Sequence, residues 1–249
     1  MSILSSIKKD KYLESKPVMK QYALAINCVI KRIFDVVLSV IGIILLSPLF
    51  LVIFCLIKTD SKGPALFKQK RLTKNGKEFY ILKFRSMYMD SENKGTGLFN
   101  YIDDPRVTKI GRKLRDTSMD ELPQLINVML GDLSLVGPRP PVSYELGDFN
   151  TLNKRYKKRF QMKAGITGLA QVMGRNNITW NMKVGYDNQY IDLFQKYGIR
   201  LDTEILWITM TNMFKRKDIY EVKPDELLED EEAAKIADEE VILQAHIPD

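Results

Sequence analysis

The longest hydrophobic run in the sequence covers residues 36–57, which read VVLSVIGIILLSPLFLVIFCLI and contain no charged side chain. Its 22 residues are enough for a helix to cross a bilayer. Seventeen of them are Leu, Ile, Val or Phe, each worth roughly −0.3 to −0.6 kcal/mol at the centre of a membrane helix, so the favourable sum is on the order of −5 to −10 kcal/mol. The run predicts a membrane helix. A helix buried in a soluble core is the alternative, and the lack of a polar face disfavours it.

Ser47 and Pro48 lie near the midpoint of this run. Proline removes one backbone hydrogen bond and clashes with the preceding turn, so we expect a kink there, with Ser47 bonding a freed backbone group. Two half-helices meeting at a sharp angle would enter and leave the bilayer on one face. Basic residues on both flanks favour this re-entrant form with both ends cytoplasmic. They are Lys31, Arg32, Lys58, Lys62, Lys68, Lys70 and Arg71. A straight helix that spans the bilayer is the alternative.

Beyond this run the pattern predicts one β-hairpin and several helices. Residues 64–88 alternate apolar and polar positions around Asn75-Gly76, a pair typical of hairpin turns. Helical patterns cover 18–30, 107–115, a stretch ending near Gly131, 186–197 and 201–214. Residues 135–141 (LVGPRPP) and 165–177 are expected to be loop, because their prolines and glycines disfavour helix and inner strand. The predicted fold class is α+β and predominantly helical.

These elements divide the chain into a lead-in at 1–29, the re-entrant helix at 30–58, a cytoplasmic domain at 59–223 and an acidic tail at 224–249. The formal net charge is +7, but the tail holds ten acidic residues and one basic residue, Lys235. Residues 1–223 therefore carry 37 basic and 21 acidic side chains. A body this basic is expected to meet anionic partners, such as nucleic acid, phosphorylated small molecules or an anionic membrane face.

The residue types exclude several kinds of site. The sole histidine, His246, lies in the acidic tail, and the only cysteines are Cys28 and Cys55. A catalytic histidine, a histidine- or cysteine-based zinc site and a disulfide framework are therefore not expected. The sequence contains no Walker A loop, dinucleotide-binding glycine fingerprint or zinc finger. Any reaction must rely on carboxylates, hydroxyls, lysine and arginine, with or without a hard cation.

Asp120 and Glu121 are the sharpest candidates for chemistry. Adjacent carboxylates can hold a divalent cation and offer a carboxylate nucleophile. A structural interpretation competes with this one. Ser118 followed three residues later by Glu121 fits a capping box, and Asp120 can itself cap a helix. On spacing alone both interpretations stay open.

Several cations are candidates for binding phosphate. Arg139 stands between two prolines, so its guanidinium is preorganised. Lys83 and Arg85 alternate on the second hairpin strand and are expected to share one face. A surface turn and a solvated strand face are the competing interpretations. The basic stretch 153–160 (NKRYKKRF) suits contact with anionic lipid, and nucleic acid is its competitor.

A colinear set of short motifs between about residues 30 and 215 resembles a known family. In chain order the matching residues are Lys31-Arg32-Ile33-Phe34-Asp35, Ser47-Pro48, Gly63-Pro64, Phe67-Lys68-Gln69, Lys83-Phe84-Arg85-Ser86-Met87, Leu114-Arg115, 118–124 (SMDELPQ), Gly131-Asp132, 134–140 (SLVGPRP), 165–168 (GITG), Gln171-Val172 and Gly174-Arg175. Together they resemble the monotopic bacterial sugar transferases, or polyprenol-phosphate phosphoglycosyltransferases. These enzymes initiate capsule, exopolysaccharide, O-antigen and some glycoprotein glycan synthesis.

The resemblance implies a two-step reaction. Asp120 would attack the β-phosphorus of a UDP-sugar and release UMP, and polyprenol phosphate would then take the sugar phosphate from the aspartate. Glu121 would hold Mg²⁺ with Asp120 or activate the acceptor. Lys83, Arg85, Arg115 and Arg139 would balance phosphate charge. Arg32 would contact the lipid headgroup, and Ser47-Pro48 would break the re-entrant helix.

The resemblance also implies a cellular location and a set of partners. The protein is expected to be monotopic at the cytoplasmic face of the inner membrane, with 59–223 as its catalytic domain. Its expected partners are a UDP-sugar, polyprenol phosphate, membrane lipid and downstream glycosyltransferases, and a homodimer is left open. Nucleic acid is not expected as a partner. The rival from another class is a membrane-tethered, non-catalytic adaptor that binds nucleic acid or lipid. The sequence does not name the sugar, the pathway or the role of the tail.

Overall fold

A computed structural model describes residues 21–89, 91, 104–174 and 178–215. The predicted lead-in is covered only from residue 21, and the predicted acidic tail lies outside the described residues. In chain order the helices and strands are α2 (Gln21–Asp60), β1 (Leu66–Leu72), β2 (Glu78–Phe84), α3 (Lys109–Asp116), α4 (Gln124–Leu130), β3 (Ser134–Val136), α5 (Lys154–Lys158), β4 (Gly165–Thr167), α6 (Leu169–Met173), α7 (Trp180–Tyr197) and α8 (Ile199–Lys215). Short 3-10 turns η1 (Lys74–Gly76), η3 (Met119–Glu121), η4 (Phe149–Thr151) and η5 (Arg159–Gln161) connect them. The described part is mostly helical with little sheet, as predicted.

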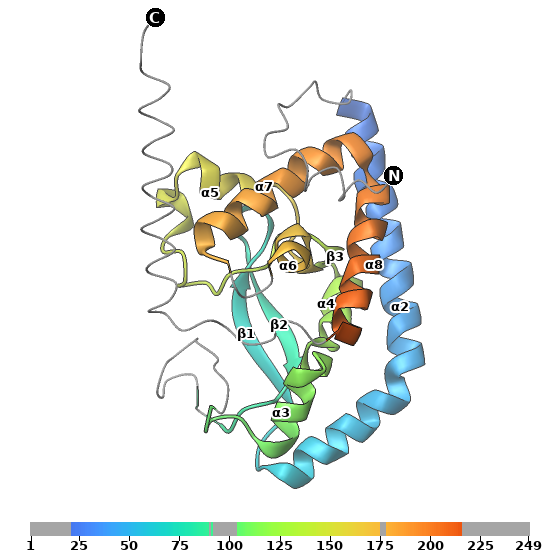
Figure 1. Cartoon of the computed structure of the whole chain (residues 1–249), viewed down its shortest axis with the longest axis vertical. Coiled ribbons are helices and arrows are strands. Elements are labelled where there is room, and N and C mark those ends of the chain that lie inside the picture. Colours follow the sequence, from blue (N-terminus) through green and yellow to red (C-terminus); the bar gives the residue numbers. More distant parts are fainter. Residues whose placement is uncertain (1–20, 90, 92–103, 175–177, 216–249) are drawn as a thin grey trace, which may run out of the picture.

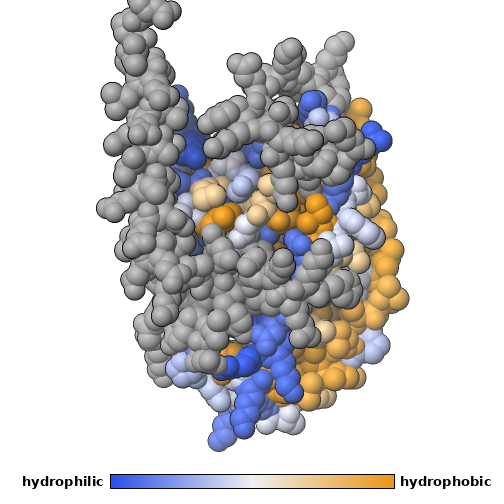
Figure 2. All heavy atoms as spheres, in the orientation of Figure 1, coloured by the Kyte–Doolittle hydropathy of each residue, from blue (hydrophilic) through white to orange (hydrophobic). Residues whose placement is uncertain are grey.

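The hydrophobic run forms part of α2, which lies along one side of the body (Figure 1). Within the described chain, this is the one helix long and apolar enough to cross a membrane, over Leu24–Asp60. Most of its large apolar side chains are exposed, and Figure 2 shows them as a continuous hydrophobic band. Since the helix leaves this band uncovered, the alternative of a helix buried in a soluble core is wrong for this structure.

Ser47 and Pro48 lie inside α2, whose axis turns toward the hairpin in its C-terminal part (Figure 1). Pro48 cannot donate to the carbonyl of Ile44, four residues earlier. The Ser47 hydroxyl donates to that same carbonyl at 2.8 Å. The expectation that Ser47 bonds the freed backbone group is confirmed. Passage of α2 in and out of one membrane face stays a prediction.

Buried polar contacts attach α2 to the body. Lys31 Nζ lies 2.6 Å from Asp202 Oδ2 on α8 and donates to the Val136 carbonyl at 2.8 Å. Tyr190 of α7 donates its hydroxyl to the other oxygen of Asp202 at 2.8 Å. One turn further along α2, Asp35 Oδ1 accepts the backbone N–H of Leu135 at 2.9 Å. Lys31, expected as a basic flank of the membrane segment, is therefore a buried link between α2, α8 and β3.

The predicted hairpin is confirmed. β1 and β2 pair antiparallel, from Leu66 opposite Phe84 to Leu72 opposite Glu78. The connection is longer than a two-residue turn, but Asn75 and Gly76 still make the reversal, with φ angles of 59° and 72°. Glycine and asparagine tolerate this left-handed region better than other residues.

Helix α4 fastens the hairpin to the core. The Asn127 side chain accepts from the Leu82 N–H at 2.9 Å and donates to the Tyr80 carbonyl at 2.8 Å, which satisfies two backbone groups of β2. Next to it, Val128 contributes to a core that α7 and α8 complete with Phe194 and Leu201. The hairpin strand that carries Lys83 is therefore held on a rigid support.

Two segments expected to be loop contain regular structure. Ser134–Val136 and Gly165–Thr167 form a parallel two-stranded sheet, and Leu169–Met173 is helical. The prediction of loop was wrong there, because three-residue strands are too short to show a periodic pattern and their pairing joins distant parts of the chain.

Candidate active site

The carboxylate pair is presented by a tight reversal after α3. Ser118 adopts a left-handed conformation with φ of 56°, and η3 follows with Asp120 and Glu121. The Ser118 side chain makes no capping hydrogen bond to this turn, and no side chain caps α4 at its start. The capping interpretations of Ser118 and Asp120 are therefore wrong, and the carboxylates are not used up as caps.

Glu121 is held by two of the predicted cations. Lys83 Nζ, from β2, lies 2.8 Å from Glu121 Oε1, and Arg139 Nη2 lies 3.9 Å from the same oxygen. The Glu121 side chain is 25 % exposed. Burial opposes its charge, but Lys83 and Arg139 outweigh that effect and lower the pKa of Glu121 to about 2. This carboxylate is ionised at any physiological pH.

Asp120 differs from its neighbour. It is buried, with 8 % of its surface exposed. Burial raises the pKa of Asp120 to about 6, the nearby charge of Glu121 adds to the rise, and the charges of Lys83 and Arg115 oppose it. Two adjacent carboxylates thus have well-separated pKa values, which is typical of a functional pair.

The sign of each charge effect can be tested on the metal-free protein. We expect the Asp120 carboxyl to titrate near pH 6. Glu121→Gln removes a negative neighbour and lowers that pKa, whereas Lys83→Met removes a positive neighbour and raises it. Carbon NMR of protein labelled at aspartate, titrated in EDTA, measures both shifts. Shifts in the same direction for the two variants would contradict the proposed charge balance.

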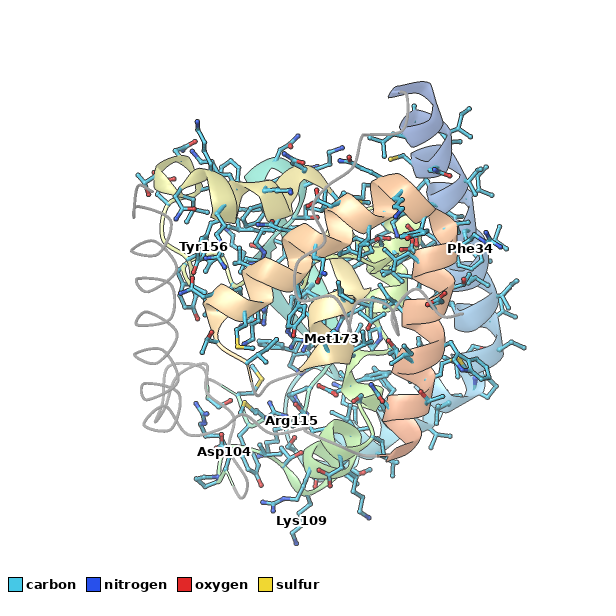
Figure 3. The ribbon with its side chains drawn as sticks, turned by 45° about the horizontal axis from the view of Figure 1, so that its top comes forward. Phe34, Asp104, Lys109, Arg115, Tyr156 and Met173 are labelled. Atoms are coloured by element: carbon cyan, nitrogen blue, oxygen red, sulfur yellow. The ribbon has the colours of Figure 1, made fainter. Side chains whose placement is uncertain are left out.

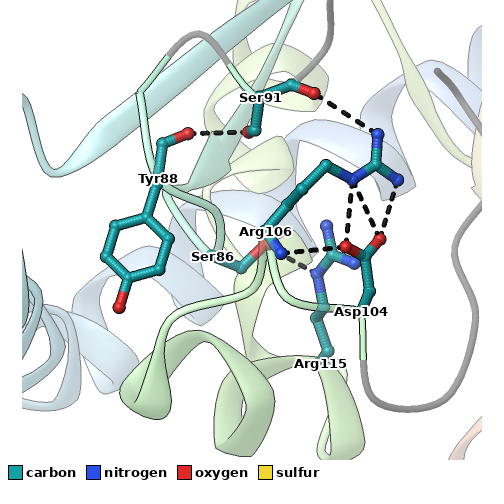
Figure 4. A network of polar contacts seen from close by, with 6 residues as sticks. All are labelled: Ser86, Tyr88, Ser91, Asp104, Arg106 and Arg115. Atoms are coloured by element: carbon teal, nitrogen blue, oxygen red, sulfur yellow. Dashed lines mark hydrogen bonds and ion pairs between the residues drawn. The ribbon is translucent and has the colours of Figure 1, made fainter. Parts of the chain in front are cut away.

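Arg115 reaches the site from α3. Its Nε donates to Ser86 Oγ at 2.8 Å (Figure 4). Next to it lies a buried pair in which Arg106 binds Asp104 through several hydrogen bonds, the shortest of 2.7 Å. Figure 3 places Asp104 and Arg115 at the same end of the molecule, and Figure 4 shows them from close by. Ser86 follows Lys83 and Arg85 in the motif, but its contact with Arg115 was not predicted from the sequence.

Arg139 follows β3 in a loop shaped by close backbone contacts. Gly137 donates its N–H to Thr167 O at 2.8 Å, and Gly165 donates to Pro138 O at 2.9 Å. A Cβ on Gly137 would lie 2.4 Å from a backbone oxygen, so only glycine fits there. Arg71 of β1, also missed from sequence, donates to the Pro140 carbonyl at 2.8 Å. The parallel sheet of β3 and β4, which was not predicted from the sequence, therefore positions Arg139.

Two predicted site residues bind elsewhere. The Arg85 guanidinium donates to the carbonyls of Ile57, Ser61 and Lys62, at the C-terminal end of α2. Arg85 is therefore buried against the end of α2, whereas Lys83 reaches Glu121. Arg32 donates to the carbonyls of Val128 and Met129 in the last turn of α4. The structure therefore shows both arginines binding helix ends, and their predicted phosphate and headgroup contacts stay untested.

Asp120 and Glu121 suit a magnesium ion that is shared with a substrate. In the part of the chain that the structure describes, no group of three or more His, Cys, Asp or Glu side chains lies together. Mg²⁺ is commonly bound by one or two carboxylates together with substrate phosphates and water. The two oxygen donors fit that pattern.

A cavity of about 10 Å³ beside Arg139 and Arg159 holds one water molecule at most and is too small for a sugar nucleotide.

Comparison with known proteins shows several related sugar transferases. A UDP-glucose:undecaprenyl-phosphate glucose-1-phosphate transferase of Klebsiella pneumoniae is 40% identical over 200 residues, covering 78% of this chain and 42% of the relative. An undecaprenyl-phosphate galactose phosphotransferase of Salmonella typhimurium is 38% identical over 205 residues, covering 77% and 42%. An uncharacterized sugar transferase, EpsL, of Bacillus subtilis is 38% identical over 192 residues, covering 77% of this chain and 90% of the relative. The chain thus spans less than half the length of the first two.

The family model described as bacterial sugar transferase matches residues 26–216. This range begins in α2, ends just beyond α8 and includes the hairpin, the carboxylate pair and the Arg139 loop. The chain belongs to the bacterial sugar transferase family.

Proposed function

We propose that this chain transfers a sugar 1-phosphate from a UDP-sugar to a polyprenol phosphate such as undecaprenyl phosphate, and releases UMP. The observation that carries the proposal is the buried Asp120 carboxylate beside the ionised Glu121, which Lys83 and Arg139 flank. Phosphoryl transfer is catalysed mainly by positioning and by compensating negative charge, which this set supplies without a histidine. The names of the Klebsiella and Salmonella relatives point to the same reaction.

In the first step an oxygen of Asp120 attacks the β-phosphorus of the donor. A bond forms between this oxygen and phosphorus, the bond from the β-phosphorus to the bridging oxygen breaks, and UMP leaves with the bonding electrons. The pKa of about 6 supports this role, because the carboxylate is ionised at neutral pH yet more basic than an ordinary aspartate. The product on the protein is a sugar-phosphoryl aspartate.

In the second step a phosphate oxygen of the acceptor attacks the same phosphorus. The bond to Asp120 breaks, which restores the carboxylate and yields polyprenyl diphosphate sugar. Asp120 and Glu121 would hold Mg²⁺, which compensates the charge of the diphosphate. A pKa of about 2 makes Glu121 a weak base, so it supports a role as ligand and fixed charge over activation of the acceptor. Lys83, Arg115 and Arg139 balance phosphate charge.

The lipid product fits a position at the membrane. We place α2 in the cytoplasmic leaflet of the inner membrane as a re-entrant helix broken at Ser47-Pro48, with the catalytic domain in the cytoplasm. The exposed apolar band and the turn of the helix axis support this placement (Figures 1 and 2). The reaction would be the first membrane step of surface glycan synthesis, followed by glycosyltransferases that extend the product.

The topology makes a prediction about the N-terminus. In inverted membrane vesicles, a tag at the N-terminus is expected to be digested by added protease, because both ends of α2 lie on the cytoplasmic face. Ser47→Ala with Pro48→Ala restores an uninterrupted helix, so a fraction of the tag becomes protected. Thr59→Ala is the matched control, since Thr59 also donates to a carbonyl three residues earlier but is followed by no proline. A protected tag in the wild type would instead establish a spanning helix.

The proposed reaction is tested by incubating the detergent-solubilised chain with Mg²⁺, a short polyprenol phosphate and a panel of UDP-sugars. UMP release with at least one donor, lost on adding EDTA, is the expected result and also identifies the sugar. If every donor fails while the basic body binds nucleic acid or anionic vesicles without Mg²⁺, the non-catalytic adaptor replaces the transferase. The carboxylate pair gives that rival no support, since a polyanion-binding surface has no use for a buried acid.

A further inference from the structure

We propose that Arg159, held by Asp187, is a positioning residue that fixes the Arg139 loop beside the catalytic carboxylates. The inference rests on the proposed function and adds two residues to its machinery. Neither residue touches the carboxylate pair in the structure. Their effect on the reaction would pass through the backbone of Arg139.

The contact between Arg159 and the loop is short and buried. Arg159 is 1 % exposed, and its Nη2 donates to the backbone carbonyl of Arg139 at 2.6 Å. The same nitrogen lies 2.8 Å from Asp187 Oδ2 on α7. The guanidinium carbon lies 5.0 Å from the centre of the Trp180 ring, so the ring also restricts the position of the guanidinium. One nitrogen therefore links α7, η5 and the loop after β3.

Stability alone does not explain an arginine at this position. Among the described residues, Nε and Nη1 of Arg159 are buried without a hydrogen-bond partner. Unpaired buried donors are costly, and replacing a buried ion pair with apolar side chains is often neutral or stabilising. An arginine that leaves two of its three nitrogens without a partner and uses Nη2 on the Arg139 carbonyl is better explained by a need to hold that carbonyl.

The local backbone makes this hold effective. Arg139 lies between Pro138 and Pro140, whose rings restrict the chain on either side. Arg71 fixes the carbonyl of Pro140 at 2.8 Å, and Arg159 fixes the carbonyl of Arg139. Because the carbonyls of Arg139 and Pro140 are both held, the backbone that carries the Arg139 side chain is fixed. Its Nη2 lies 3.9 Å from Glu121 Oε1. Loss of Arg159 or Asp187 would release the carbonyl of Arg139.

The test is a double-mutant cycle between Asp187→Asn and Arg139→Gln, read as UMP release at pH 8. This pH is chosen because burial raises the pKa of Asp187 to about 6, so the wild-type carboxylate is ionised. Asp187→Asn is expected to lower kcat/KM by roughly 10- to 100-fold. In the Arg139→Gln background the same change is expected to have an effect under about threefold, because the residue it acts through is gone. Additive effects in the cycle would overturn the inference.

A matched control lies between the same two segments. Lys158 and Asp192 form an ion pair of 2.7 Å, but it is exposed and does not contact the Arg139 loop. Asp192→Asn is expected to leave kcat/KM unchanged. Arg159→Lys gives a second variant if Asp187→Asn does not fold. It keeps a positive charge for Asp187 but lacks Nη2, the atom that reaches the Arg139 carbonyl, so its effect on UMP release is expected to vanish in the Arg139→Gln background too.

A second readout does not depend on activity. Hydrogen exchange at the Gly165 amide, which donates to the Pro138 carbonyl beside Arg139 at 2.9 Å, is expected to speed up several-fold in Asp187→Asn and to stay unchanged in Asp192→Asn. If the wild type releases no UMP from any donor, the proposed reaction is wrong and this exchange measurement still decides the positioning role. Equal exchange in Asp187→Asn and wild type would overturn the inference even if the transferase reaction is established.

Discussion

Asp120→Asn is expected to lower the rate of UMP release by at least about 10³-fold, since an amide cannot replace the attacking carboxylate. Donor binding should change little, because Lys83 and Arg139 remain in place on Glu121. The measurement is UMP release under saturating UDP-sugar, together with calorimetric binding of UDP. A variant that keeps most of its activity would remove Asp120 from the reaction.

Loss of folding is not a competing explanation for this variant. The folded chain holds the pKa of Asp120 at about 6, above the ordinary aspartate value of 3.8. The folded state therefore binds the proton more tightly than the unfolded state, and the stability contributed by Asp120 falls as the pH rises from about 4 to 6. Asparagine removes this unfavourable charge, so the unfolding midpoint at pH 8 should be equal to or above that of the wild type. Asp192→Asn, a change of the same type on the surface of α7, serves as the activity control.

Lys31→Met is expected to destabilise the fold by about 3–5 kcal/mol, because it leaves the Asp202 carboxylate buried without its cation. The two side chains are 8 % and 2 % exposed, and Lys31 also satisfies the Val136 carbonyl. Denaturant unfolding in detergent micelles measures the change. Since Val136 belongs to the strand that precedes the Arg139 loop, activity should fall along with stability.

Two comparisons show whether the effect belongs to the buried pair. Lys70→Met breaks an ion pair with Glu78 whose side chains are 50 % and 52 % exposed, and it should leave the unfolding midpoint nearly unchanged. Lys31→Met combined with Asp202→Leu removes both charges and should recover a large part of the loss. If Lys31→Met and Lys70→Met destabilise the protein equally, the buried link is not what attaches α2 to the body.

The sequence predicted the parts of the fold that depend on residues close together in the chain. Asn75 and Gly76 supply the left-handed positions of the hairpin turn, and the hydrophobic run forms the apolar part of α2. The helix before Gly131 ends at Leu130, with Gly131 in the left-handed conformation that favours glycine. Each of these features depends on residues within one or two turns of chain.

The features that the sequence did not predict depend on distant partners. Lys31 and Asp202 are 171 positions apart, and the strands β3 and β4 gain their structure only from each other. Arg85 was expected beside Lys83 because strands alternate, but its guanidinium binds carbonyls at the end of α2, which lie more than 20 positions earlier in the chain. At the candidate site, residue types were enough to nominate Asp120, Glu121, Lys83 and Arg139, and the family resemblance added Arg115. The residues that position them, Ser86, Arg71 and Arg159, emerged only from the structure.

The central claim is that the sugar phosphate passes through Asp120, and trapping it there tests this most directly. The chain is incubated with Mg²⁺ and a UDP-sugar labelled at the β-phosphorus, without acceptor, and the peptide that contains Asp120 is analysed by mass spectrometry. We predict one sugar phosphate on Asp120, cleaved by hydroxylamine and transferred when polyprenol phosphate is added. Asp192→Asn should carry the label as the wild type does. Transfer of the labelled phosphate to polyprenol phosphate without label on the protein at any time would contradict the covalent mechanism.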